Sequence, residues 1–235
     1  MYDRTIANRT LNFEASGGLL DAALVMRDRE TDSWWSIMKG ASIGGPMEGR
    51  GLSELPAGEK AMWGEWRRRH PETRVLSVEG KSHVATNHYE NHFTSERTFR
   101  NAKVSDERLA AKHPIFAFRL QSLAYAVAHE TVAGGYLATA GDSSKAAPQV
   151  FLFREPGSSV FATTRAWLVP RGLIRSDAGG FVAEPRGRGR PKPVRLDSAA
   201  SLERLAMIDG VSVLPGLDTY WYTWVAVNRE TSLLR

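Results

Sequence analysis

Short apolar runs separated by polar turns fill the N-terminal part of the chain, and this pattern predicts strands rather than helices. Residues 2–15 are expected to form a hairpin that turns at residues 7–9. Residues 24–35 form a second apolar stretch, interrupted by a polar turn at residues 28–32. We therefore expect a strand-rich first half.

The same pattern returns in the C-terminal part. Residues 114–128 predict a hairpin around Gln121 and Ser122, and residues 150–163 predict another that turns at residues 156–158. Further strands are expected between residues 167 and 182.

Three segments predict helices. Residues 61–69 are helical in pattern and are expected to stop at His70, because the residue before a proline is disfavoured in helical space. A short helix is expected over residues 201–208, and another near residues 219–227.

A set of motifs occurs twice in the same order. Leu55-Pro56, Trp63, Trp66, Glu72-Thr73 and Leu76 recur as Leu214-Pro215, Trp221, Trp224, Glu230-Thr231 and Leu234. Two tryptophans three residues apart lie on one side of a helix and form a packing unit. The sequence thus predicts an α+β, strand-rich fold of two degenerate repeats of β-hairpins, each closed by a Trp-x-x-Trp helix. We place the first, truncated repeat at residues 1–81, a connecting segment at 82–112 and the second repeat at 113–235.

The first repeat is expected to lack one hairpin that the second repeat has. The strand near residues 2–6 would then expose unpaired backbone groups at a sheet edge. This predicts a less stable first half and possible self-association through that N-terminal edge.

Composition excludes several classes of protein. The 235 residues are 42% apolar and 24% charged and include seven tryptophans and nine phenylalanines, enough for one large or two small cores. There is no cysteine, which excludes disulfides, thiolate metal sites and a thiol nucleophile. No apolar run approaches the roughly 20 residues of a membrane helix, and the N-terminus does not resemble a signal peptide. We expect the cytoplasm for the chain as written, or an extracytoplasmic location if an N-terminal portion is missing.

The net charge of +5 is concentrated in one short segment. Residues 186–195 carry five basic side chains and no acid, so the other residues hold 26 basic against 26 acidic side chains. Their glycines and prolines predict an extended, solvated loop. Arg188, Arg190 and Lys192 resemble the core of an AT-hook, in which an extended Arg-Gly-Arg-Pro lies in an A·T minor groove. DNA association through this loop is therefore one hypothesis, beside that of a simple solvated insertion.

A histidine group lies in the connecting segment. His83, His88 and His92, with Asn87 and Glu96 nearby, are candidate ligands for a transition metal such as zinc, copper or iron. The other interpretation is a set of surface or hydrogen-bonding histidines in a loop.

No motif identifies a reaction. Gly40, Ser42 and Gly44 match the G-x-S-x-G pattern of hydrolases, but that motif needs a helix directly after the serine and Pro46 follows. We expect a glycine-rich turn there. Catalytic residues stay unknown.

Several ordered motifs together resemble a known bacterial family. They are Tyr2-Asp3-Arg4, Arg9-Thr10-Leu11-Asn12-Phe13, Met26 with Asp28-Arg29-Glu30-Thr31-Asp32-Ser33-Trp34-Trp35, Gly44-Gly45-Pro46-Met47 with Gly49, and Trp63 with Trp66 and His70-Pro71-Glu72-Thr73. Nearly the whole chain is similar to the domain of unknown function 3179. The resemblance implies an upstream strand pair and a two-cysteine segment that this chain lacks, so no role of those cysteines transfers here.

The leading interpretation is a non-catalytic domain that binds a small ligand or a protein partner between its halves, around residues 83–100. The alternatives are a metal-binding protein or metalloenzyme using His83, His88 and His92, and DNA association through residues 188–192.

Overall fold

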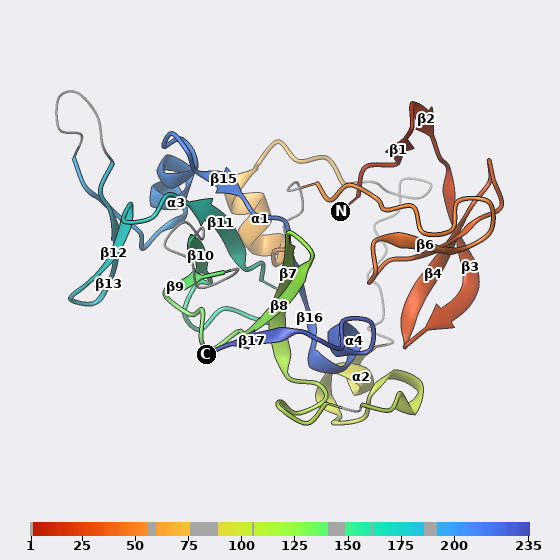
Figure 1. Cartoon of the computed structure of the whole chain (residues 1–235). Coiled ribbons are helices and arrows are strands. Elements are labelled where there is room, and N and C mark those ends of the chain that lie inside the picture. The colour runs from red at the N-terminus through yellow and green to blue at the C-terminus, as the bar shows by residue number, and fades with distance from the viewer. Residues whose placement is uncertain are drawn as a thin grey trace.

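The structure is a computed structural model, and the part of the chain that it describes comprises residues 2–55, 60–75, 89–104, 106–140, 149–160, 162–185 and 192–235. Within these residues, short antiparallel sheets dominate and the helices are short (Figure 1). The predicted strand-rich α+β class is confirmed, whereas the internal repeat stays a prediction.

The first half is a small antiparallel meander. Its strands are β1 (Thr5–Ile6), β2 (Arg9–Thr10), β3 (Phe13–Leu20), β4 (Ala23–Asp28), β5 (Trp34–Ser36) and β6 (Ala41–Gly44). β1 pairs only with β2, and β3 to β6 form a sheet in chain order. The expected turns between β1 and β2 and between β4 and β5 are present. The core here is small: Leu11, Trp35 and Leu52 are its buried apolar members.

The first half contains a hairpin that the sequence did not reveal. β3 and β4 pair around a two-residue turn at Asp21 and Ala22. The sequence concealed this strand because Gly17 and Gly18 are typical strand breakers. They lie instead where the pairing register shifts between Ala15 and Leu19, and Gly17 takes a φ of +77° there.

The N-terminal residues have backbone partners within the chain. Tyr2 forms a β-bridge with Glu54, and the Asp3 N–H donates to the Ser53 carbonyl at 2.8 Å. The expected unpaired edge is therefore partly covered, because residues 51–54 return beside the N-terminus.

Three short helical segments follow: α1 (Trp63–Arg69), α2 (Glu90–Thr94) and a 3-10 turn (Phe99–Asn101). α1 ends at His70, as predicted from Pro71. The sequence also predicts a strand over residues 75–83, and all of these residues except Val75 lie outside the described part of the chain.

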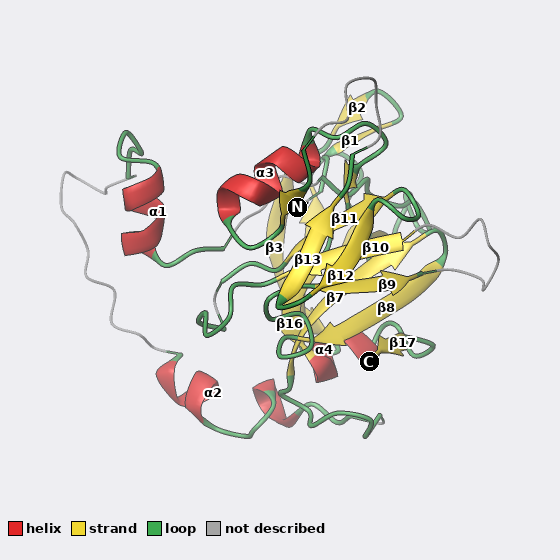
Figure 2. Cartoon of the chain, turned by 90° about the vertical axis from the view of Figure 1, so that its left-hand side faces the viewer, coloured by secondary structure: helices red, strands yellow, loops and turns green. Residues whose placement is uncertain are grey.

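The described residues of the second half form three sheets and two helices. Its elements are β7 (Pro114–Leu120), β8 (Leu123–Ala128), β9 (Tyr136–Thr139), β10 (Gln149–Phe153), β11 (Arg165–Val169), β12 (Ile174–Asp177), β13 (Gly180–Ala183), β14 (Val194–Arg195), α3 (Ala199–Ala206), β15 (Ser212–Val213), β16 (Leu217–Tyr220), α4 (Trp221–Val225) and β17 (Ser232–Leu234). The sheet orders are β16-β7-β8-β17, β15-β11-β10-β9 and β12-β13-β14. Figure 2 shows these sheets gathered together, with α1 and α2 standing to one side.

Layers cover both faces of the central strands. Alternate residues of a strand point to opposite faces. Ile115 and Ala117 of β7 accordingly pack with α4, whereas Phe116 and Phe118 pack toward β10 and β11. Burial on both faces explains the continuous apolar run in β7.

The hairpin predicted over residues 150–163 is formed by other strands than expected. β10 pairs with β11 from Gln149 opposite Val169 to Phe153 opposite Arg165, so residues 154–164 form the connection rather than part of a strand. The sequence suggested a tight turn at Pro156 and Gly157, but the buried Arg154 side chain holds a longer loop.

The two halves meet at Arg119 of β7. Its guanidinium donates to the Met38 carbonyl at 2.6 Å, to Glu54 at 3.2 Å and to Asn228 at 3.1 Å. Met38 itself belongs to the apolar cluster of α4 and β7. Among the described residues, no helix has the length and apolar character needed to cross a membrane.

Candidate functional site

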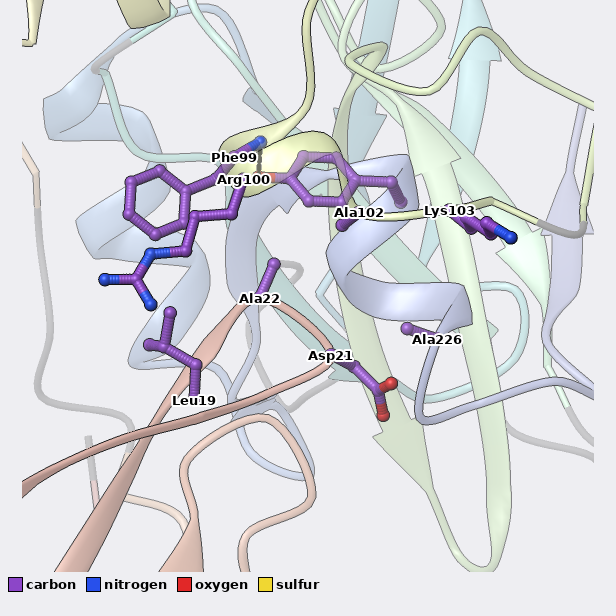
Figure 3. A pocket seen from close by; sticks show the side chains of 9 residues that line it. Leu19, Asp21, Ala22, Phe99, Arg100, Ala102, Lys103 and Ala226 are labelled. Atoms are coloured by element: carbon purple, nitrogen blue, oxygen red, sulfur yellow. Dashed lines mark hydrogen bonds between the residues drawn. The ribbon is translucent and has the colours of Figure 1, made fainter.

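A cavity of about 350 Å³ lies where the first half, the connecting segment and the second half meet (Figure 3). It is lined by Leu19, Asp21, Ala22, Phe99, Arg100, Ala102, Lys103, Tyr222 and Ala226. Pockets for small ligands commonly measure about 300–1,000 Å³, so this one is at the small end of that range.

One wall is the tight turn between β3 and β4. Asp21 and Ala22 have φ values of +50° and +62°, the left-handed pair that a two-residue hairpin turn requires. This turn directs Leu19 and Ala22 toward the connecting segment, as Figure 3 shows.

A second wall is the 3-10 turn of the connecting segment. Arg100 and Asn101 also have left-handed backbones, with φ of +51° and +54°. The Ala102 N–H donates to the Phe99 carbonyl at 3.1 Å, and the Thr98 hydroxyl donates to the Ala102 carbonyl at 2.8 Å. These bonds hold in place a turn that non-glycine residues adopt at a cost.

Tyr222 of α4 closes the cavity from the second half. Its ring is buried, and its hydroxyl accepts a long hydrogen bond of 3.4 Å from the Phe99 N–H. Burial raises the pKa of the Tyr222 phenol, against a smaller opposing effect of that N–H. The phenol therefore keeps its proton at neutral pH.

The charged side chains lie at different ends of the cavity. The Arg100 guanidinium is 5.6 Å from the centre of the Phe99 ring, on the side of Leu19, whereas Lys103 lies at the far end (Figure 3). Asp21 is the carboxylate in the lining. The lining thus offers an apolar middle between two separated cations.

The structure describes two of the predicted metal-site residues. His92 lies on α2 among three aromatic rings, those of Phe93, Phe99 and Tyr220, with centroids 5.6–6.1 Å away. Burial, and then the positive charge of Lys112, lower the pKa of His92, so its imidazole is neutral at pH 7.

The other members of that predicted set are placed as follows. Glu96 is exposed. His83, Asn87 and His88 lie outside the described residues. No group of three metal-ligating side chains occurs within the part of the chain that the structure describes.

Of the three residues predicted to contact nucleic acid, the structure describes Lys192. Lys192 is exposed just before β14, and Arg188 and Arg190 lie outside the described ranges. β14 ends at Arg195, and α3 begins at Ala199 with a capping box formed by Ser198 and Ser201.

Ser42 is not the nucleophile of a hydrolase elbow. It lies in β6 rather than in the glycine-rich turn that we expected, and only 4% of it is exposed. Its hydroxyl donates to the carbonyls of Trp34 and Gly44. It satisfies strand backbone at an irregular pairing, which does not fit the exposed serine of a nucleophile elbow.

A buried polar network in the second half was not foreseen from the sequence. One Asp218 oxygen accepts from His129 at 2.9 Å and lies 3.5 Å from the Arg154 guanidinium, and the other accepts from the Thr164 N–H at 3.0 Å. All four residues are at most 9% exposed. The sequence shows polar residues at the ends of apolar strands, but it does not show which of them contact one another.

The cavity between the halves was only partly foreseen. The expected ligand region reached Arg100, and Phe99 and Arg100 do line the cavity. Lining residues from β3, its turn and α4 were missed, because their contribution depends on how the halves pack and not on any local motif.

Comparison with known proteins gives one match. The family model described as "Protein of unknown function (DUF3179)" matches residues 1–231. No curated protein and no solved structure matches the chain.

Proposed function

Because this chain belongs to the DUF3179 family, whose function is not known, we propose from its geometry that it binds a small ligand between its halves without catalysing a reaction. The observation that carries this proposal is the cavity of about 350 Å³ formed by three separate segments of the chain. A ligand there would contact the first half, the connecting segment and α4 at once. Sites between structural units are a preferred location for ligands.

The lining indicates the chemistry of the ligand. Leu19, Ala22 and Phe99 offer an apolar surface, and an aromatic ring pairs well with a planar apolar group. Arg100 and Lys103 favour an acidic group at an end of the ligand. We therefore infer a small amphipathic molecule with an apolar body and an anionic group.

The same lining favours binding over catalysis. The described residues that line the cavity include one carboxylate and one phenol, and no histidine, serine or threonine. Since burial raises the pKa of Tyr222, the phenol does not act as a base near neutral pH. Asp21 and Lys103 are the other groups in the lining that can transfer a proton, and neither is hydrogen-bonded to Tyr222 within the described structure.

A fluorescent probe tests the proposal. Anilinonaphthalene sulfonate has an aromatic body and one anionic group, and it brightens in apolar sites. We expect saturable binding to the native protein, weakened at least about tenfold, or roughly 1.4 kcal/mol, by Ala102→Phe, which fills the cavity. Ala200→Phe is the matched control, because Ala200 is exposed on α3 and lies outside the lining.

Equal binding by both variants would overturn the proposal. The parent protein and the two variants must have the same thermal melting curve, so that a loss of binding cannot be caused by a loss of folding.

Two other hypotheses stay predictions. Elemental analysis of the tag-free protein, repeated after His88→Ala and His92→Ala, tests the metal site: about one transition metal per chain, lost in both variants, would support it. DNA association through Arg188, Arg190 and Lys192 predicts binding that weakens steeply with salt.

A further inference from the structure

A second cavity, of about 460 Å³, lies beside the second half and away from the first. It is lined by Lys60, Met62, Arg68, Arg69, Phe153, Glu155, Pro156, Gly157, Ser158, Ser159, Ala162, Thr163, Arg165, Ala199 and Leu202. These residues come from α1 and the residues just before it, from the adjoining ends of β10 and β11 and the loop between them, and from α3.

The loop wall is fixed by a buried guanidinium. Arg154 is 4% exposed and donates to the Ser159 carbonyl at 2.5 Å and to the Ala162 carbonyl at 2.6 Å. Asp218 lies 3.5 Å from Arg154 and also accepts from the Thr164 N–H. Removing one partner of such a buried pair would leave the other charge uncompensated, so the pair fixes this loop against the second half.

The opposite wall is clamped to that loop. The Thr163 N–H donates to the Lys60 carbonyl at 3.0 Å, and the Lys60 N–H donates back to the Thr163 hydroxyl. The Lys60 ammonium reaches past the loop and donates to the Asp218 carbonyl at 2.7 Å. The segment that leads into α1 is thereby fixed against the second half, although the two are about a hundred residues apart in sequence.

The lining is rich in cations. Among the described residues that form it, Lys60, Arg68, Arg69 and Arg165 are basic and Glu155 is acidic. Ser158 also lines the cavity, and its hydroxyl is buried and has no hydrogen-bond partner within the described structure. A buried hydroxyl without a partner is costly and is usually satisfied by a bound group or water.

We propose that this cavity binds a small anion, a phosphate or carboxylate group of a free metabolite, between α1 and the β10–β11 loop. Guanidinium groups bind both anions through paired hydrogen bonds, and a hydroxyl adds a neutral donor. The site is separate from the cavity between the halves and does not depend on the function proposed there.

Neighbouring arginines on α1 supply a matched test. Arg67 and Arg68 are both exposed and lie in the last turn of the helix, but only Arg68 lines the cavity. Isothermal titration with inorganic phosphate on the full chain should give saturable binding that Arg68→Gln weakens at least about tenfold, or 1.4 kcal/mol. Arg67→Gln should leave phosphate binding within about twofold of the parent chain, because Arg67 does not line the cavity. It is the matched control because it removes the same net charge.

Ser158→Ala gives a second, uncharged test. It should weaken phosphate binding severalfold without lowering the melting temperature, because the hydroxyl has no other described partner. Titration with citrate in place of phosphate then distinguishes a carboxylate site from a phosphate site, because the anion that binds more tightly identifies the preferred group.

Equal loss in Arg67→Gln and Arg68→Gln would show a nonspecific charge effect and overturn the proposal. Absence of saturable binding by either anion would overturn it as well.

Discussion

The two Trp-x-x-Trp helices have the same motif and opposite surroundings. In α4, Trp221 and Trp224 are 0% and 2% exposed and pack against β7 and β8. In α1, Trp63 is 48% exposed, and Trp66 stacks on His70 of its own helix end at 4.2 Å. A motif that predicts a helix therefore does not predict what that helix packs against.

The surrounding hairpins explain the difference. The β7–β8 hairpin is buried on both faces, and α4 covers one of them. The β3–β4 hairpin leaves Leu19, Leu20 and Leu24 each more than a third exposed. α1 does not cover it, because Lys60 ties the start of the α1 segment to Thr163 and Asp218 of the second half. Among the described residues, the first half consequently has one small apolar cluster of its own, whereas two clusters lie in the second half and a third joins α4, β7 and β8 to Met38.

Tryptophan truncation should show the largest contrast. Trp221→Ala removes a fully buried ring and the bond from its indole N–H to the Asp106 carbonyl at 3.0 Å, so we expect a loss of about 3–5 kcal/mol in the free energy of unfolding. Trp63→Ala should cost less than about 1 kcal/mol, because half of that ring is already in water. Urea unfolding followed by circular dichroism measures both.

Similar losses in the two variants would mean that α1 packs as α4 does. Trp221→Phe and Trp63→Phe are the controls, because each keeps an aromatic ring and removes the indole N–H.

A smaller contrast is expected in pH dependence, from Asp28 of the first half. Burial by itself would raise the pKa of Asp28, but hydrogen bonds from Trp35, Thr31 and Ser33 together hold it below its ordinary value. A carboxylate with a lowered pKa in the folded state contributes stability above its unfolded pKa of about 3.9. That stability is lost as the pH falls through the folded pKa.

Asp28→Asn should therefore cost about 1–2 kcal/mol at pH 7 and progressively less below pH 4. The measurement is the free energy of unfolding from pH 7 downward for parent and variant. Asp32→Asn, at an exposed position of the same turn, is the control. Parallel pH profiles for parent and Asp28→Asn would contradict this role.

The strand pattern made much of the fold predictable. Apolar runs and turn residues located the β7–β8 hairpin and the β4–β5 turn, and Pro71 located the end of α1. Each of these signals is local. The strand β3 was not predicted, because its glycines are typical strand breakers. In the structure, the pairing with β4 accommodates these glycines at a shift in register.

The candidate sites were much less predictable. Phe99 and Arg100 fell in the expected region, but Leu19 and Tyr222 line the same cavity only because the halves pack through Arg119 and Met38. Likewise, nothing local in the sequence links Lys60 to Thr163. Residue contacts across a hundred positions depend on tertiary packing and carry no periodic signal.

The central claim is that the second half is the more stable part of the molecule, and that the first half and the connecting segment pack against it to form the walls of a ligand cavity. Hydrogen exchange followed by mass spectrometry tests this claim most directly. We predict the slowest exchange in β7, β8 and α4, and faster exchange in β3, β4 and residues 98–104. Adding anilinonaphthalene sulfonate should slow exchange in residues 98–104 and in the β3–β4 turn. Equal protection of both halves, unchanged by the probe, would contradict the account.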